Sequence, residues 1–118
     1  MNDKIFLTIK EEYDKFYRSL LKKGRLPMWS TEKGFWNSSI TDDLYETFKK
    51  INLHKFKSFL DIGSGDGKVV LIASLFCKNA EGIEIDDFLH NKYYSHIAKH
   101  SQNIYLVLLF SPMFHYNC

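Results

Sequence analysis

The chain has 118 residues, enough for one small domain with a modest hydrophobic core. Hydrophobic residues make up 45% and aromatic residues 16% of the sequence, a composition typical of a globular rather than a disordered protein. The formal net charge is only +2, so no strong attraction to nucleic acid or to an anionic membrane follows from it. Because the first residues mix charged and apolar types, we expect neither a secretory signal nor a spanning helix, and we expect a cytoplasmic protein.

The N-terminal part of the chain predicts two helices with a loop between them. Apolar residues recur at helical spacing over residues 4–23, and Gly24 follows a basic last turn, as at the end of an amphipathic helix. Residues 25–39 contain a proline, a glycine and both tryptophans, which predicts an irregular loop. The Thr-Asp-Asp run at 41–43 then favours the N-cap of a helix over residues 41–52.

From residue 57 onward, the pattern alternates between strands and helices. It predicts strands at 57–61, 82–85 and 104–110, with helices at 68–78 and 87–100. Parallel strands joined by right-handed helical crossovers follow from this alternation. The sequence therefore predicts an α/β fold: a partial doubly wound, Rossmann-like parallel sheet of three strands with helices, preceded by N-terminal helices.

The most informative segment is the glycine-rich turn that follows the first predicted strand of this sheet. Glycine can adopt a positive φ and lets backbone N–H groups come close to a ligand. A P-loop needs four residues between its glycines, but only three separate Gly63 from Gly67. The G-x-G-x-x-G fingerprint needs a glycine where Lys68 stands, and a calcium loop needs oxygen ligands in place of Gly63 and Gly65. The spacing therefore excludes all three loops.

A second acidic position stands at the end of the next predicted strand. Glu84 lies roughly twenty residues beyond the first strand, the spacing at which doubly wound folds place a ribose-binding acid. A carboxylate suits this role because its two oxygens can accept from two adjacent hydroxyls. Alternative interpretations stay open for the neighbours: Asp86 or Asp87 as the N-cap of the next helix, and Asp66 as a solvated turn residue.

Asp61 and the three alternating glycines that follow it resemble motif I of the class I S-adenosylmethionine-dependent methyltransferases. Glu84 resembles the acid at the end of the second strand in the same family. The resemblance covers roughly residues 57–100 and implies S-adenosylmethionine as the cofactor. The cofactor-binding residues that it implies are Asp61, Gly63, Ser64, Gly65, Gly67, Glu84, Ile85 and Asp86.

The resemblance also implies a role for each part of this set. Asp61 would brace the loop and meet the methionine amino group, while the glycines would admit the cofactor. Glu84 would hold both ribose hydroxyls, and Ile85 and Asp86 would lie beside the adenine. No catalytic residue follows from the resemblance.

The motif looks closest to protein-lysine methyltransferases related to the histone H3 core methylase, which implies a protein substrate. The sheet of the family has seven strands, whereas this pattern stops after three. We therefore expect an N-terminal helix and aromatic loop in residues 1–40 and a truncated cofactor-binding domain in residues 41–118. The alternative is a non-catalytic fragment that keeps the fold and acts as a binding or interaction module. An uncovered sheet edge would favour marginal stability or self-association.

Two further groups have open or unremarkable interpretations. Trp29, Phe35 and Trp36 could attract a sulfonium cation or could fill a small core. His96 and His100 lie one helical turn apart, but no acid or cysteine completes a metal cluster, so we predict a solvated helix face and no metal. Cys77 is expected to pack as a small hydrophobic residue.

Overall fold

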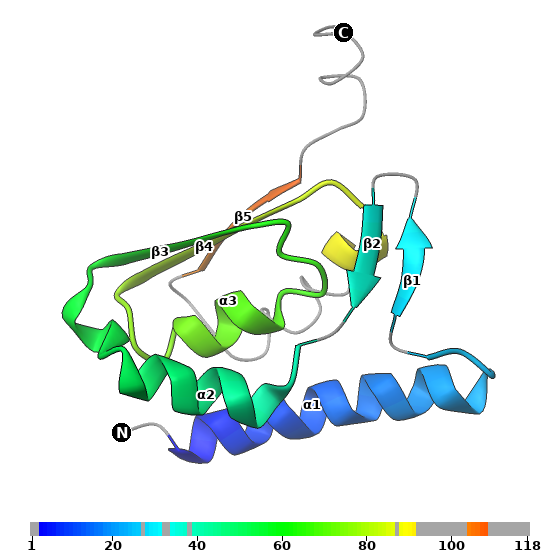
Figure 1. The fold of residues 1–118 in the computed structure, drawn as a ribbon, viewed down its shortest axis with the longest axis horizontal. Coiled ribbons are helices and arrows are strands. Elements are labelled where there is room, and N and C mark those ends of the chain that lie inside the picture. The colour runs from blue at the N-terminus through cyan, green and yellow to red at the C-terminus, as the bar shows by residue number, and fades with distance from the viewer. Residues whose placement is uncertain are drawn as a thin grey trace, which may run out of the picture.

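The computed structural model describes residues 3–26, 28–31, 34–37, 39–86, 88–91 and 104–108. Three helices lie on one side of a three-stranded sheet, and a two-stranded hairpin stands apart from it (Figure 1). The helices are α1 (Asp3–Lys22), α2 (Thr41–Lys50) and α3 (Lys68–Ala73), with a short 3-10 helix, η1 (Leu53–Lys55). The strands are β1 (Met28–Thr31), β2 (Gly34–Asn37), β3 (Ser58–Ile62), β4 (Asn79–Glu84) and β5 (Ile104–Leu108).

The three-stranded sheet is parallel and has the order β3-β4-β5. Asp61 of β3 pairs with Gly82 of β4, and Ile83 of β4 pairs with Val107 of β5. The helix α3 connects β3 to β4 and packs against both strands. The predicted α/β fold with a partial Rossmann-like sheet is therefore confirmed, and the carboxyl ends of β3 and β4 meet at one edge of the sheet.

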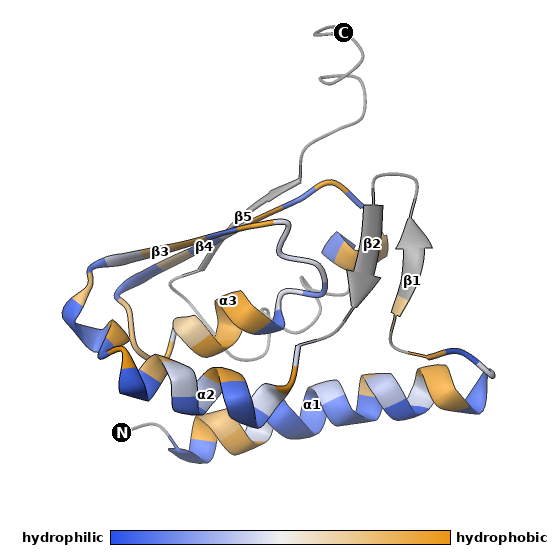
Figure 2. Cartoon of the chain, viewed as in Figure 1, coloured by the Kyte–Doolittle hydropathy of each residue, from blue (hydrophilic) through white to orange (hydrophobic). Residues whose placement is uncertain are grey.

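The core lies between the sheet and the helices. Four consecutive apolar residues of α3, at positions 70–73, are completely buried, and Figure 2 shows α3 as the most uniformly hydrophobic helix. The helix α1 instead buries one stripe at helical spacing, which includes Phe6, Ile9 and Phe16. Phe6 stacks on Tyr45 of α2 with ring centroids 3.8 Å apart. One hydrophobic cluster thus joins α1, α2 and α3 to the sheet.

The opposite face of β3 carries exposed apolar side chains. Leu60 is 51% exposed and Ile62 is 77% exposed, whereas Phe59, which points to the helices, packs against the core. Among the described residues, the outer edge of β3 has no strand partner. Self-association through this edge stays a prediction, as does the division of the chain at residue 40.

The loop predicted at residues 25–39 is wrong in its central part, because β1 and β2 form an antiparallel hairpin there. Trp29 lies opposite Trp36 in the register, and only two residues separate the strands in the sequence. Aromatic residues favour strands, and a two-residue connection is typical of hairpins. The glycine of this segment, Gly34, is therefore the first residue of β2, beside the turn of the hairpin.

The predicted cap of α2 is also wrong. Ile40 occupies the N-cap position and makes no side-chain hydrogen bond to the helix, while Thr41 is its first residue. The Asp42 carboxylate is instead 2.9 Å from the Lys10 ammonium of α1. Asp42 and Asp43 still place negative charge in the first turn, where it stabilises the helix by interacting with the positive end of the helix dipole.

The remaining boundaries differ modestly from those predicted. The helix α3 ends at Ala73, five residues early, and the chain continues in turns. The strand β4 begins three residues early, at Asn79. Residues 88–91 are helical, and the rest of the helix predicted to residue 100 lies outside the described residues, as do His96 and His100. Among the described helices, none combines the length and apolar character needed to cross a lipid bilayer.

Candidate functional site

The loop between β3 and α3 contains three glycines with left-handed backbone conformations. The φ angles are 81° at Gly63, 56° at Gly65 and 80° at Gly67. Residues with a Cβ rarely adopt such angles, which explains the alternating glycines of the motif. The Gly63 and Ser64 N–H groups both donate to the Ile83 carbonyl, at 2.8 and 2.9 Å. The loop is therefore tied to the end of β4 as soon as it leaves β3.

Glu84 completes this attachment. One carboxylate oxygen accepts from the Gly65 N–H at 2.6 Å, and the other accepts from the Ile85 and Asp86 N–H groups at 2.9 and 2.8 Å. The side chain is buried, with 7% of its surface exposed. The two acidic strand ends predicted as a pair therefore meet at one edge, with Glu84 directed at the middle of the glycine loop.

Asp61 lies beside this arrangement at the end of β3. Its side chain is half-buried, and burial raises the pKa of the carboxyl, with a smaller contribution from the negative charge of Glu84. Among the described residues, Asp61 does not donate to or accept from the loop; the Ile83 carbonyl and Glu84 brace it instead. The bracing of the loop that was expected of Asp61 thus comes from β4.

Gly82 is a site residue that the sequence analysis missed. A Cβ at this position would lie 2.8 Å from Val70 Cγ2 and 2.9 Å from Ser64 Cβ and Oγ. The strand β4 therefore needs glycine so that α3 and the loop can pack directly on its backbone. Ser64 Oγ is buried and has no hydrogen-bond partner in the described part of the chain.

The end of β4 also starts the next helical segment. Asp86 Oδ1 accepts from the Leu89 N–H at 3.0 Å, and the Asp86 carbonyl accepts from the His90 N–H. Asp86 is therefore the N-cap, one of the alternatives left open by the sequence. The positions proposed beside an adenine, Ile85 and Asp86, are both half-buried next to Glu84.

Asp66 is not the solvated turn residue that one interpretation allowed. It is 4% exposed, and it accepts hydrogen bonds from two tyrosines of α1. Lys68, which follows the last glycine, is also buried, and its ammonium donates to the Ser39 carbonyl. Burial raises the pKa of Asp66 and lowers the pKa of Lys68.

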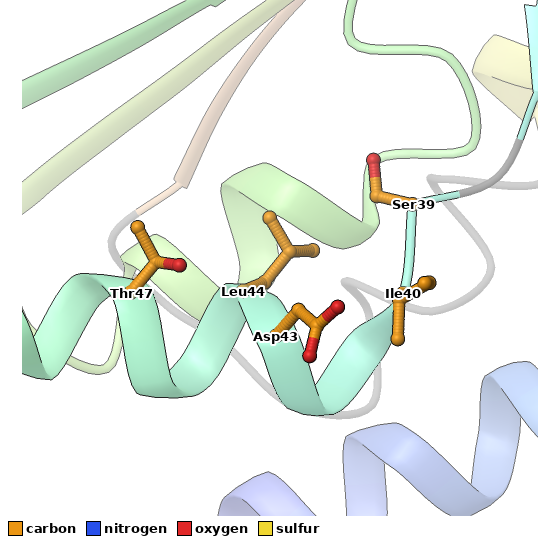
Figure 3. A pocket seen from close by; sticks show the side chains of 5 residues that line it. All are labelled: Ser39, Ile40, Asp43, Leu44 and Thr47. Atoms are coloured by element: carbon orange, nitrogen blue, oxygen red, sulfur yellow. The ribbon is translucent and has the colours of Figure 1, made fainter.

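A separate cavity of about 210 Å³ lies along α2 (Figure 3). Its lining comes from α2 and the two residues before it: Ser39, Ile40, Asp43, Leu44 and Thr47. None of the predicted cofactor-binding residues lines it. Among the described residues, no three histidine, cysteine or acidic side chains gather as a metal site would require.

The parallel sheet, the glycine loop after its first strand and the acid after its second define the fold of the class I methyltransferases. The family described as "Histone methylation protein DOT1" matches residues 37–109, more than half of the chain. The chain therefore belongs to this family. The predicted family is confirmed. S-adenosylmethionine is also confirmed as the cofactor of this family.

Solved structures show the same fold. An RNA methyltransferase from Salinibacter ruber, in complex with S-adenosyl-L-homocysteine, is 20% identical with a TM-score of 0.55, covering 62% of this chain and 50% of that one. A protein-L-isoaspartate O-methyltransferase is 14% identical with a TM-score of 0.55, covering 92% and 42%. The YcgJ protein from Bacillus subtilis is 19% identical with a TM-score of 0.52, covering 60% and 31%.

The chain thus spans half of the length of the Salinibacter protein and less than half of the length of the other two. No curated protein sequence matches the chain significantly.

Proposed function

We propose that this chain binds S-adenosylmethionine at the Gly63–Gly67 loop and serves a methyltransferase that acts on protein. The observation that carries the proposal is the contact of the Glu84 carboxylate with the Gly65 amide. This contact lies at the carboxyl edge of two parallel strands, the place where doubly wound folds bind nucleotides. A turn of three left-handed glycines beside an acid can receive an adenosyl group on its backbone.

The hydrogen bonds of Glu84 are compatible with a ribose contact. A carboxylate offers roughly four lone-pair sites, and three backbone N–H groups occupy three of them. One ribose hydroxyl can donate to the remaining site without breaking the bond to Gly65, so we assign Glu84 one hydroxyl in place of the two that the resemblance implied. The three amides also fix the orientation of the carboxylate before any ligand arrives, which lowers the entropic cost of binding.

The charges of the site favour a cationic ligand. Asp61 and Glu84 are two acids close enough for Glu84 to raise the pKa of Asp61. A positively charged group between them relieves this repulsion. S-adenosylmethionine carries two such groups, an ammonium and a sulfonium, and Asp61 is assigned to the ammonium.

The contribution of these residues to methyl transfer is orientation. When bound, S-adenosylmethionine supplies an electrophilic methyl group on a positively charged sulfur. Asp61 would hold the ammonium end of the ligand and Glu84 its ribose. The glycines of the loop have no side chains in the way, so the loop's own backbone can come close to the ligand. Holding the reacting groups in line is the main catalytic requirement of such a displacement.

We assign a protein acceptor, a lysine side chain, from the family to which the chain belongs. The chain spans half or less of the methyltransferases it resembles in structure, so we assign it the binding of the cofactor rather than the whole reaction. Cytoplasmic localisation remains part of the proposal.

Titration calorimetry with S-adenosylhomocysteine tests the cofactor site. We expect Glu84→Gln to weaken binding at least about tenfold, because the amide replaces one acceptor oxygen by a donor that faces backbone N–H groups. Glu81→Gln is the matched control, since Glu81 is an exposed acid on the same strand. No heat at millimolar ligand, or tighter binding of NAD, contradicts the proposal.

Transfer of a labelled methyl group to a cell extract tests the acceptor. We expect label that protease removes and ribonuclease leaves. Label removed by ribonuclease would contradict a protein acceptor. Binding of S-adenosylhomocysteine without any transfer would leave the non-catalytic binding module as the function of the chain.

A further inference from the structure

The glycine loop is attached to the N-terminal helix through Asp66. The Tyr13 hydroxyl donates to the Asp66 carbonyl at 2.7 Å, and the Tyr17 hydroxyl donates to Asp66 Oδ2 at 2.8 Å. Tyr13 is completely buried, and the two tyrosines lie 53 and 49 residues before Asp66 in the sequence. Residues of α1 therefore contact both the backbone and the side chain of Asp66 in the loop.

Lys68 extends this attachment to the segment before α2. Its backbone N–H donates to Asp66 Oδ1 at 3.3 Å, and its ammonium donates to the Ser39 carbonyl. The ammonium also lies 4.7 Å from the centre of the Tyr17 ring, within the range of a cation–π contact. One buried network thus joins α1, the loop and residue 39.

The network is costly in free energy for a simple turn. Burying an aspartate and a lysine removes both charges from water, and an apolar replacement of similar volume is often equally stable or more stable. The opposed shifts in pKa, upward at Asp66 and downward at Lys68, both come first from burial. A buried polar network therefore contributes to specificity more than to stability. It favours one conformation, the one in which every buried donor has its hydrogen-bond acceptor.

We propose that Tyr13 and Tyr17 are positioning residues, which hold the Gly65–Gly67 backbone in the conformation that receives the cofactor. The inference rests on the proposed function. The glycines make the loop intrinsically flexible, so a support outside the loop determines how much of the time its amides face the ligand. The helix α1 supplies this support through Asp66.

Tyr17→Phe tests the proposal, with Tyr45→Phe as a matched control. Each variant loses one hydroxyl that donates to a carboxylate and links α1 to another part of the chain: Tyr17 to Asp66, and Tyr45 to Asp3. Only Tyr17 contacts the loop. Two measurements are made, the affinity for S-adenosylhomocysteine and the amide hydrogen exchange of Gly65 and Gly67 without ligand.

For Tyr17→Phe we expect about tenfold weaker binding and faster exchange at both glycines. For Tyr45→Phe we expect a comparable loss of thermal stability, with affinity and exchange within about twofold of the unsubstituted chain. A structural role alone would lower stability in both variants without moving the exchange of the loop. For Asp66→Asn, the affinity and the exchange rates should lie between those of the unsubstituted chain and those of Asp66→Ala, because the amide oxygen can still accept from Tyr17.

The outcomes separate this inference from the proposed function. If the exchange at Gly65 and Gly67 is the same in Tyr17→Phe and the unsubstituted chain, the positioning role is overturned whether or not ligand binds. If the unsubstituted chain binds no ligand while Tyr17→Phe still exchanges faster, the support of the loop stands and the cofactor function falls. Should Tyr17→Phe not fold, the same comparison is made with Asp66→Asn.

Discussion

The two halves of the glycine loop are held by different parts of the molecule. The first half, Gly63–Gly65, donates its three N–H groups to the end of β4, to the Ile83 carbonyl and the Glu84 carboxylate. The second half, 66–68, makes its contacts with α1 and with Ser39. The first half is thus supported by the neighbouring strand, and the second half by a helix from the start of the chain.

This difference teaches how a flexible sequence acquires one conformation. Contacts of the first half span about twenty residues and come with the β3-α3-β4 unit itself. Contacts of the second half span about fifty residues and require α1 to dock. Loss of the contacts of either half should therefore weaken ligand binding, but loss of those of the first half should cost more stability, because they belong to the β3-α3-β4 unit itself.

The largest effect is expected from Glu84→Ala, which breaks the first half. The substitution leaves three backbone N–H groups without their acceptor, so we expect the free energy of unfolding to fall by about 3 kcal/mol. Denaturant unfolding measures it. Glu81→Ala, at an exposed position of the same strand, should stay within about 0.5 kcal/mol. Equal losses in the two variants would show that Glu84 does not hold the loop.

Gly82→Ala disturbs the same half of the loop by adding a methyl group on β4, where Ser64 packs. The added Cβ would lie 2.8 Å from Val70 and 2.9 Å from Ser64, so either the loop or α3 must shift. We expect a loss of about 2 kcal/mol in the free energy of unfolding, typical of overpacking. Truncating one neighbour in Gly82→Ala/Val70→Ala should relieve part of the steric cost. Additive losses in the double variant would argue against direct contact as the cause.

Gly63→Ala separates backbone strain from steric contact. Apart from its two chain neighbours, no atom of the described residues lies within 4 Å of a Cβ built at Gly63, but its φ is 81°. The expected loss is therefore the strain alone, about 1–2 kcal/mol in the free energy of unfolding. Gly63→Asn should cost less despite its larger side chain, because asparagine tolerates the left-handed region. A larger loss for Asn than for Ala would mean that space, not backbone conformation, requires this glycine.

The sequence predicted the first half of the loop far better than the second. Alternating glycines and the spacing of Glu84 are local signals, and both lead to the contact that the structure contains. Gly82 gave no signal, because its requirement arises only when Val70 and Ser64 pack on β4. Tyr13 and Tyr17 gave no signal either, since nothing in a single sequence joins positions some fifty residues apart.

The smallest effect concerns Asp61, where stability and function are expected to oppose each other. Burial raises the pKa of this carboxyl in the folded chain above the ordinary value of 3.8. The native state therefore binds the proton more tightly than the unfolded state, and the ionised carboxylate destabilises the fold at neutral pH. Asp61→Asn removes that cost, so we expect Tm to rise by about 2 °C at pH 7.

The gain in Tm should fade as the pH falls through the folded pKa of Asp61 and should be absent below 3.8, where both states are protonated. Affinity for S-adenosylhomocysteine should instead fall about tenfold in the variant, because the ammonium of the ligand loses a charged partner. Calorimetric scans at several pH values and titrations at pH 7 measure the two effects. A variant that is both less stable and equally tight in binding would remove Asp61 from the ligand site.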